Sequence, residues 1–273
     1  MDNQDPPVQV HWYNAHTVML RQNKAYEVQA PFMFLYFGND RAVLFDQGSV
    51  SNPSYLSIRD VVDGVVAQWC KQNGREDIPL VVANTHLHGD HYSGWTQFID
   101  RPNTAMVGLT HEERMAFFGM THYPEQRVEF DLGGRKLLLW GSPGHEASEI
   151  AIYDPYTQLL CTGDMFYPGR CYVRDFPSWL ASMERLVKFA DEFPITHLIN
   201  CHIEISQHGF DYPTYTSYQP DEPPMDMTVD TLRRVYAAAK TVQQKGITPV
   251  SGKVYIYNQV GFAETMEKNS YAY

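Results

Sequence analysis

Four side chains that can bind a metal ion lie within six residues, as His86-x-His88-x-Asp90-His91. Imidazole nitrogens and carboxylate oxygens are, beside thiolates, the donors that zinc prefers. His86 and His88 lie two residues apart and can point to one side of a turn. Asp90 and His91 follow around the bend and can face a second ion. Four ligands on one loop cannot all bind one ion and leave a position open for catalysis, so the cluster predicts two ions.

Three further donors each follow a different predicted strand. His145 sits in a Pro-Gly turn, Asp164 comes directly after an apolar run, and His202 follows another. A cation explains why so many ionisable groups gather, because without a partner they would be costly to crowd together. The carboxylate of Asp164 can bridge two cations with its two oxygens. The sequence therefore predicts a metal site assembled from several strand ends.

Alternating strands and helices must position these donors. Apolar runs predict strands at residues 8–12, 32–37, 42–45, 80–83, 105–109, 128–132, 136–140, 149–153, 159–162, 196–200 and 254–257. Helical spacing of apolar residues predicts helices over 58–69, 93–99, 111–120, 177–190 and 232–239. The turn residues Asn39 and Asp40 predict a hairpin between 32–37 and 42–45. The run 80–83 lacks polar alternation, so it predicts a strand buried on both faces, and the metal cluster begins three residues after it.

The length of 273 residues suits one large domain or two small ones. Helix and strand alternate to the end without a dividing linker, so we predict a single α/β layered domain over residues 1–273. Residues 206–227, which are rich in Pro, Tyr and Asp, predict a long loop close to the active site. The tail over 262–273 is expected to be loosely held.

Composition narrows the expected partners. A formal net charge of −11 disfavours nucleic acid, and no run of 18 apolar residues predicts a membrane span. The acidic, polar start lacks the pattern of a secretory signal, so a cytoplasmic protein is expected. The four scattered cysteines predict reduced thiols rather than disulfides.

The stretch Thr85-His86-Leu87-His88-Gly89-Asp90-His91 resembles the signature of the metallo-β-lactamase-fold hydrolase superfamily. Gly144-His145, Gly163-Asp164 and Cys201-His202 are similar to its later metal motifs, in the expected order. The likeness covers roughly residues 30 to 205, and residues 44–48 fit the strand and turn that precede the signature. The resemblance implies a four-layer αββα sandwich with the metals at one rim of the paired sheets.

The same resemblance implies a division of the ligands between two Zn²⁺ ions, with iron or manganese as alternative metals. The first ion would be bound by His86, His88 and His145, the second by Asp90, His91 and His202, with Asp164 bridging them. The bridging Asp164 is similar to the glyoxalase II and lactonase branches rather than to β-lactamases with a cysteine ligand.

The implied activity is that of a zinc-dependent dinuclear hydrolase. A metal-bound hydroxide would attack the carbonyl of a small ester, thioester, lactone or lactam. Asp90 and Tyr167 are the predicted catalytic residues. Tyr167 lies three residues after Asp164, and in the lactonase branch a tyrosine at this spacing contacts the substrate carbonyl. The alternative, that Tyr167 only lines the pocket wall, stays open.

The predicted substrate-binding residues are Arg170, Tyr172 and Trp95. Arg170 could hold a substrate carboxylate through two hydrogen bonds. No cluster of basic residues accompanies it, so glutathione thioesters are one candidate among several, and an aromatic pocket fits a lactone, lactam or hydrophobic ester. A small-molecule substrate is therefore the expected partner, with the oligomeric state left open between monomer and homo-oligomer.

Three other carboxylates, Asp46, Glu146 and Glu204, lie near the motifs and could orient imidazoles, although solvated loop residues are the commoner case for the two glutamates. Two other functions compete with the hydrolase. One is a mononuclear iron oxidoreductase on the same fold, similar to a persulfide dioxygenase, and the full set of seven ligands favours two ions over it. The other is a non-catalytic binding protein, which the intact ligand set disfavours.

Overall fold

The structure is a computed structural model that describes residues 5–209, 212–213, 215–242, 246–251 and 253–259. The chain divides into two compact units, Met1–Leu139 with Pro213–Tyr218, and Trp140–Tyr212 with Gln219–Tyr273. Each unit is described by itself. The predicted loosely held tail, 262–273, lies outside the described residues, and the prediction of one domain over the whole chain stays a prediction.

Unit 1 is built on a six-stranded mixed sheet in the order β1-β2-β3-β4-β5-β6. The first four strands form an antiparallel meander, and β4, β5 and β6 run parallel. The strands are β1 (Val8–Asn14), β2 (Thr17–Gln22), β3 (Phe32–Phe37), β4 (Ala42–Phe45), β5 (Leu80–Ala83) and β6 (Thr104–Met106). The predicted hairpin between β3 and β4 is confirmed, and β5 is buried at every residue, as its uninterrupted apolar run predicts.

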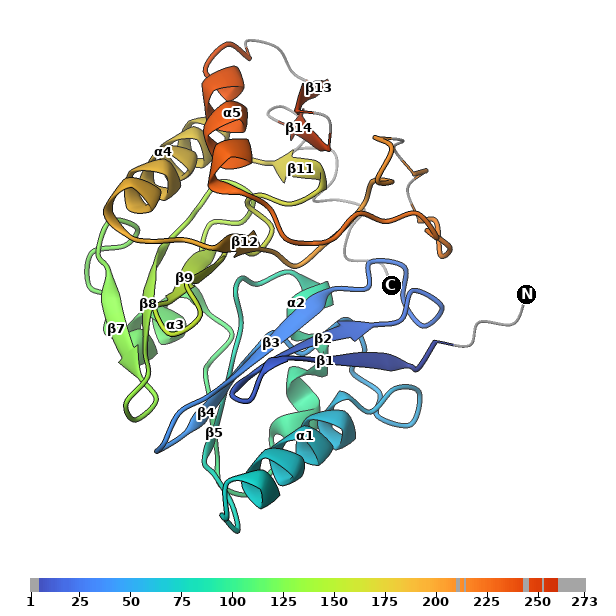
Figure 1. The fold of residues 1–273 in the computed structure, drawn as a ribbon, viewed down its shortest axis with the longest axis vertical. Helices are drawn as coiled ribbons and strands as arrows, with labels where there is room; N and C mark the ends of the chain where they lie inside the picture. The colour runs from blue at the N-terminus through green and yellow to red at the C-terminus, as the bar shows by residue number, and fades with distance from the viewer. Residues whose placement is uncertain (1–4, 210–211, 214, 243–245, 252, 260–273) are drawn as a thin grey trace. The chain divides into compact units, whose positions relative to one another are not determined.

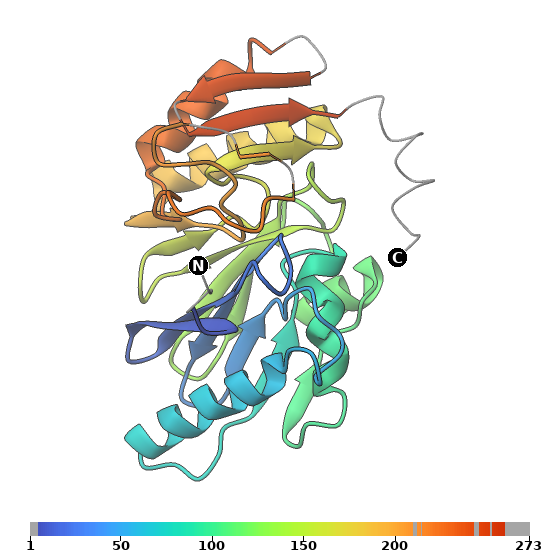
Figure 2. The same cartoon turned by 90° about the vertical axis from the view of Figure 1, so that its right-hand side faces the viewer.

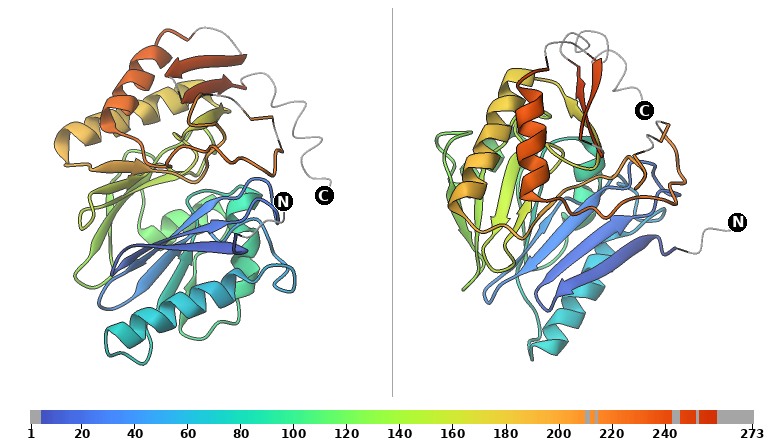
Figure 3. Two further views of the ribbon diagram at one scale, coloured as in Figure 1. Left: turned by 45° about the vertical axis from the view of Figure 1, so that its right-hand side comes forward. Right: turned by 45° about the horizontal axis from the view of Figure 1, so that its top comes forward.

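Helix α1 (Ile58–Gln72) covers one face of this sheet (Figures 1 and 3). The Ser57 hydroxyl begins the helix by accepting a hydrogen bond from the backbone N–H of Asp60, at 3.2 Å. The buried face includes Val62, Val66 and Trp69. Burial of each such side chain contributes about 1.5–3 kcal/mol, so packing rather than helix propensity holds α1 against the sheet.

After β5 the chain forms a single helical turn, α2 (Gly89–Tyr92), and then a 3₁₀ helix, η1 (Ser93–Phe98). Helix α3 (His111–Phe118) follows, with a reciprocal cap between Thr110 and Glu113. Strand β6 ends at Met106, earlier than predicted, and the chain passes through Gly108 into a bend at Leu109 and Thr110. A Cβ at Gly108 would lie 2.4 Å from the Glu113 carboxylate, so this segment packs closely against α3.

The second mixed sheet has the order β12-β10-β9-β8-β7, and the division between the units falls within β8. Its strands are β7 (Val128–Asp131), β8 (Lys136–Gly141), β9 (Ile150–Asp154), β10 (Leu159–Cys161) and β12 (His197–Ile199). Strands β9 and β10 pair antiparallel, whereas β10 and β12 pair parallel, so their carboxyl ends share one edge. Two mixed sheets flanked by helices confirm the predicted α/β class.

Unit 2 also contains a small sheet in the order β11-β14-β13. It consists of β11 (Gly169–Val173), β14 (Val254–Asn258) and β13 (Gly246–Ser251), and Figure 2 shows β13 and β14 lying side by side. Helices α4 (Phe176–Glu192) and α5 (Val229–Ala239) pack together (Figure 3). The described residues of 206–227 form turns and bends, with one isolated bridge between Leu198 and Met227.

All four cysteines lie in the described part of the chain and are buried, and none of them forms a disulfide there; reduced thiols in the cell stay a prediction. Within the described residues, every helix is too short or too polar to cross a membrane.

Gly64 on α1 offers a test of how this helix is packed. It is exposed, and a Cβ built there meets nothing within 4 Å. Gly64→Ala should raise the free energy of unfolding by about 0.5–1 kcal/mol, because alanine loses less conformational freedom in a helix. Urea unfolding measures this. Gly38→Ala is the matched control and should destabilise, because its Cβ would lie 2.1 Å from the Leu132 carbonyl oxygen. Equal effects of the two substitutions would contradict the packing of unit 1.

Candidate metal centre

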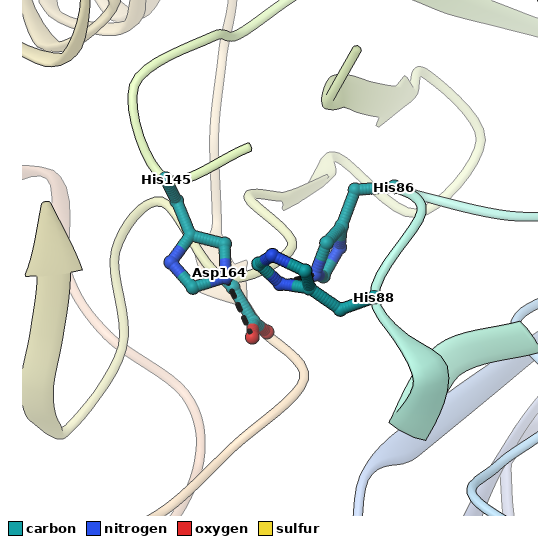
Figure 4. A group of neighbouring side chains, drawn as sticks. All are labelled: His86, His88, His145 and Asp164. Carbon is teal, nitrogen blue, oxygen red and sulfur yellow. Dashed lines mark hydrogen bonds and ion pairs between the residues drawn. The ribbon is translucent and has the colours of Figure 1, made fainter. Parts of the chain in front are cut away.

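Unit 1 carries four of the predicted metal donors between β5 and η1. His86, Asp90 and His91 are buried, and His88 is half-buried (His86 and His88 are drawn in Figure 4). Thr85 to His88 form the loop that leaves β5, and α2 then turns the chain so that Asp90 and His91 follow around the bend, as the spacing predicts.

Within this set, the separations between donor atoms match those around a metal ion. His86 Nε2 lies 3.0 Å from His88 Nδ1, and His91 Nε2 lies 3.3 Å from Asp90 Oδ2. Two donors bound to the same tetrahedral zinc, at 2.0–2.1 Å each, would be about 3.3 Å apart. The His86 and His88 nitrogens are therefore close enough to share one ion.

A buried carboxylate orients His91. Asp46 Oδ2 lies 3.0 Å from His91 Nδ1 and accepts a hydrogen bond from Thr85 Oγ1 at 2.8 Å, while Oδ1 accepts from the Thr85 backbone N–H at 2.7 Å. With Nδ1–H directed at Asp46, the Nε2 of His91 is left to act as a metal donor. Asp46, which the sequence marked as a candidate, therefore fixes both the tautomer of His91 and the loop that carries His86.

A buried arginine holds the same loop from the side of α3. The side chain of Arg114 is fully buried, and its Nη2 donates to the carbonyl oxygens of Asn84 and Thr85 at 2.7 and 2.9 Å. Sequence reasoning did not single out Arg114. Its only signal is a basic residue inside an otherwise amphipathic helix, which is usually read as a solvent-exposed position.

Unit 2 carries the other three predicted donors, His145, Asp164 and His202, and all three are buried. Asp164 Oδ2 lies 3.4 Å from His145 Nε2, the ion pair marked by the dashed line in Figure 4, and 3.2 Å from His202 Nε2. The sequence suggested that each carboxylate oxygen would face a different ion. In the structure the same oxygen faces both imidazoles, at separations typical of donors that share a metal, about 3.3 Å.

The second nitrogen of His145 is also occupied. His145 Nδ1 lies 2.7 Å from the backbone carbonyl oxygen of Tyr172 on β11. A carbonyl can only accept a hydrogen bond, so Nδ1 carries the hydrogen and Nε2 is left as a donor atom toward Asp164. His91 and His145 thus share the arrangement expected of metal-binding histidines, in which the non-ligating N–H is held by an oxygen.

Helix α4 braces the loops that present these donors. The Trp179 indole donates to the Met165 carbonyl oxygen at 2.9 Å, and Ser182 Oγ donates to the Pro143 carbonyl oxygen at 2.7 Å. Gly144 has φ 139°, and a Cβ there would lie 2.3 Å from the Trp179 Cα. Only glycine fits this approach, which explains the glycine directly before His145.

The donor sets of the two units fit metal ions. Apart from the half-buried His88, both consist of buried imidazole and carboxylate groups, and the separations between imidazole and carboxylate donors, 3.2–3.4 Å, are close to that of ligands on one ion. A buried carboxylate also needs compensation by a positive charge or by hydrogen bonds. The residues that would hold the metal are therefore the seven predicted ones.

Tyr167 lies beside this centre within unit 2. Its ring is buried and lies 5.9 Å from the His202 ring, centroid to centroid. Its hydroxyl donates to the Arg170 carbonyl oxygen and lies 3.4 Å from Glu204 Oε2. Burial, with a smaller contribution from Glu204, raises the pKa of Tyr167 well above its ordinary range. The phenol therefore stays protonated at neutral pH.

The predicted substrate-binding residues lie in different surroundings. Arg170 Nη2 donates to the Tyr212 carbonyl oxygen at 2.9 Å, and its Nε lies 3.9 Å from Glu204. Tyr172 is half-buried on β11 and contacts the Tyr257 ring edge-on. Contact of these residues with a substrate stays a prediction.

Trp95 belongs to unit 1. Its indole N–H donates to the Val107 carbonyl oxygen at 2.9 Å, and its ring packs against the apolar core of that unit. A role in substrate binding also stays a prediction for Trp95.

Two carboxylates near the motifs differ from their sequence-based readings. The Glu146 carboxylate accepts two hydrogen bonds from Ser148, from its Oγ at 2.6 Å and from its backbone N–H at 3.0 Å. Glu149, which the sequence placed only in a strand, is fully buried and accepts hydrogen bonds from the backbone N–H groups of Asp164 and Met165. No sequence signal distinguishes Glu149, because its partners lie fifteen residues farther along the chain.

The sequence pattern of the Metallo-beta-lactamase superfamily matches residues 27–194, which are more than half of the chain. Solved structures share the fold. A metallo-beta-lactamase from Erythrobacter litoralis is 15 % identical with a TM-score of 0.55, covering 88 % of this chain and 99 % of that one. A metallo-beta-lactamase from Pontibacter korlensis is 18 % identical with a TM-score of 0.51, covering 71 % and 91 %. These likenesses confirm the predicted sandwich fold.

Two curated relatives match more closely in sequence over shorter spans. A hydroxyacylglutathione hydrolase from Acaryochloris marina is 29 % identical over 99 residues, which are 34 % of this chain and 38 % of the relative. The Acyl-coenzyme A thioesterase MBLAC2 of Bos taurus is 24 % identical over 200 residues, 58 % of this chain and 68 % of the relative. The chain thus spans well under half the length of the first of these.

Replacing Asp46 tests whether it orients a metal-binding histidine. Asp46→Asn puts an amide N–H₂ in place of one acceptor oxygen, so the remaining oxygen cannot accept from both the Thr85 backbone N–H and His91 Nδ1. We expect zinc affinity to fall by about 10–100-fold, the usual cost of losing such a partner. Competition with a chromophoric chelator measures the zinc Kd. Asp131→Asn, at an exposed position of β7 in the same unit, is the control. Wild-type affinity in Asp46→Asn would show that His91 does not need this carboxylate.

Proposed function

The chain belongs to the Metallo-beta-lactamase superfamily, and on that premise we propose that it is a dinuclear zinc-dependent hydrolase of small thioesters. The donors of unit 1 and those of unit 2 would together bind the two ions, with Asp164 as the shared ligand. The imidazole and carboxylate donors of each unit support metal binding, and the names of the relatives support a thioester as the substrate.

One observation carries the proposal. His91 and His145 each have Nδ1 held by an oxygen, from Asp46 and from the Tyr172 carbonyl, and each has Nε2 beside a carboxylate that is itself a candidate ligand. An ordinary structural histidine needs no such pairing on both nitrogens. This arrangement supports metal binding because it sets the tautomer before any ion arrives.

Bound divalent ions would lower the pKa of a coordinated water to near neutrality and polarise the carbonyl that is attacked. The chain's own residues supply the rest. Asp46 and the Tyr172 carbonyl hold the Nδ1 side of the two imidazoles, so that each presents Nε2 for coordination. Tyr167, with its raised pKa, is a neutral hydrogen-bond donor, and an oxygen that gains negative charge in the transition state is a stronger acceptor than the Arg170 carbonyl it now contacts.

A thioester is the favoured substrate among the carbonyl compounds that the sequence leaves open. The two relatives described above are, by name, a hydroxyacylglutathione hydrolase and an acyl-coenzyme A thioesterase. Arg170, on the strand that follows the Asp164 loop, would offer a positive charge to an acidic group of the thiol part. Such a group is present in both kinds of thiol carrier.

The proposed function is tested on protein whose metal content has been measured. Zinc-loaded protein should contain about two zinc ions per chain. It should cleave an acyl-glutathione or acyl-coenzyme A substrate faster than matched oxygen esters, lactones and β-lactams. Removal of the metal with a chelator should abolish the activity, and added zinc should restore it. One iron per chain with oxygen consumption on thiol substrates would overturn the hydrolase in favour of an oxidoreductase, and an inactive zinc protein would also contradict it.

Tyr167→Phe tests the proposed role of the phenol. We expect kcat on the best thioester to fall by about 100-fold, as for loss of one donor to a developing oxyanion. KM and zinc content should stay unchanged. The lost hydrogen bond to Arg170 should cost only about 1 kcal/mol of stability. Tyr153→Phe is the control, since Tyr153 is also buried and its hydroxyl also donates to a carbonyl oxygen, that of Pro194 at 2.6 Å. Unchanged kcat in Tyr167→Phe would remove the hydroxyl from the mechanism.

A further inference from the structure

Glu149 is a fully buried carboxylate that lies directly before strand β9. Its Oε1 accepts two hydrogen bonds from consecutive backbone N–H groups, that of Asp164 at 2.6 Å and that of Met165 at 3.1 Å. Two successive N–H groups pointing at one oxygen form a small concave site for negative charge. The side chain therefore binds the turn that presents Asp164, rather than Asp164's own carboxylate.

Other hydrogen bonds hold this turn at its carbonyl oxygens, from the Trp179 indole to Met165 at 2.9 Å and from the Cys201 N–H to Gly163 at 3.1 Å. Gly163 takes the left-handed conformation, with φ 55°, and the Met165 N–H also lies 3.0 Å from the Thr162 carbonyl oxygen. The Glu149 oxygen receives the N–H of Asp164 as well and so sets the direction in which the residue leaves the turn. Because the peptide unit is planar, fixing this N–H restricts where the Asp164 side chain can point.

The backbone of Glu149 closes a second loop. Its carbonyl oxygen accepts from the Ser142 N–H at 2.7 Å, and its own N–H lies 3.4 Å from the Glu146 carbonyl oxygen. His145 lies on the loop that these bonds close. One residue thus connects the loop of His145 to the turn of Asp164, whose donor atoms lie 3.4 Å apart.

We propose that Glu149 is a positioning residue for the metal centre, which holds the Asp164 carboxylate in register with His145 and His202 through the backbone of the turn. The inference rests on the proposed metal-binding function and deepens it. What matters is an acceptor oxygen at the position of Oε1, so the length of the side chain is decisive and its charge is secondary.

Two conservative variants separate these properties. Glu149→Gln keeps a side-chain oxygen at the same reach and removes the charge. Glu149→Asp keeps the charge and withdraws the oxygen by about 1.5 Å, one carbon–carbon bond. We expect the zinc Kd of Glu149→Asp to rise by about 10–100-fold, and that of Glu149→Gln to stay within ~3-fold of wild type. Chelator competition measures the Kd, and the visible spectrum of the cobalt-substituted protein reports whether the ligand geometry changes.

Asp154 provides the matched control. It lies at the other end of β9, is equally buried, and accepts from Thr157 Oγ1 at 2.6 Å and from the Tyr156 N–H at 3.2 Å. Asp154→Asn should lower the melting temperature of the metal-free protein and leave the zinc Kd unchanged. Glu149→Asp should instead raise the zinc Kd and change the cobalt spectrum. These changes should be larger than any loss of stability, measured by the melting temperature, accounts for.

The outcomes distinguish the inference from the proposed function. If wild-type protein binds no zinc, the proposed function fails and this inference fails with it. If wild-type protein binds zinc and Glu149→Asp binds it equally well, only the inference is overturned. It is also overturned if Glu149→Gln loses affinity while Glu149→Asp keeps it, because charge would then be the property that matters.

Discussion

Two carboxylates buried beside strand ends constrain the turns that carry the metal donors. Asp46 and Glu149 are both fully buried, and each accepts the backbone N–H of a turn, that of Thr85 in unit 1 and that of Asp164 in unit 2. A buried carboxylate is costly unless hydrogen bonds or a cation compensate it. The turns supply those hydrogen bonds, and in return the carboxylates hold the turns in one conformation. The same interaction therefore satisfies the acid and orders the loop.

This constraint extends to the chemistry of the histidines. An imidazole bound through Nδ1–H to a fixed oxygen can offer only Nε2 to an ion, so its tautomer is set by the fold. Asp46 does this for His91, and the backbone of β11 does it for His145. Strands and buried side chains position these oxygens, so little reorganisation is needed when an ion binds. Such pre-organisation favours tight binding and a site of defined geometry.

Sequence reasoning singled out the candidate donors and found most of the elements because both leave local signals. The clustered motif around His86 and the apolar run of β5 can be read within a few residues. Strands β2, β11 and β13 were missed. Strand β13 contains Pro249, which is unusual within a strand, and β11 pairs with β14, which lies far along the chain. Glu149 was missed for the same reason, since its role arises from a turn that folding brings against it.

X-ray absorption by the zinc-loaded wild-type protein tests the central claim, that imidazole and carboxylate donors of this chain bind a pair of ions. The account predicts a first shell of nitrogen and oxygen alone, at about 2.0–2.2 Å. It also predicts zinc–zinc scattering at about 3.5–4 Å. A sulfur shell at about 2.3 Å, or zinc centres without a second metal nearby, would contradict it.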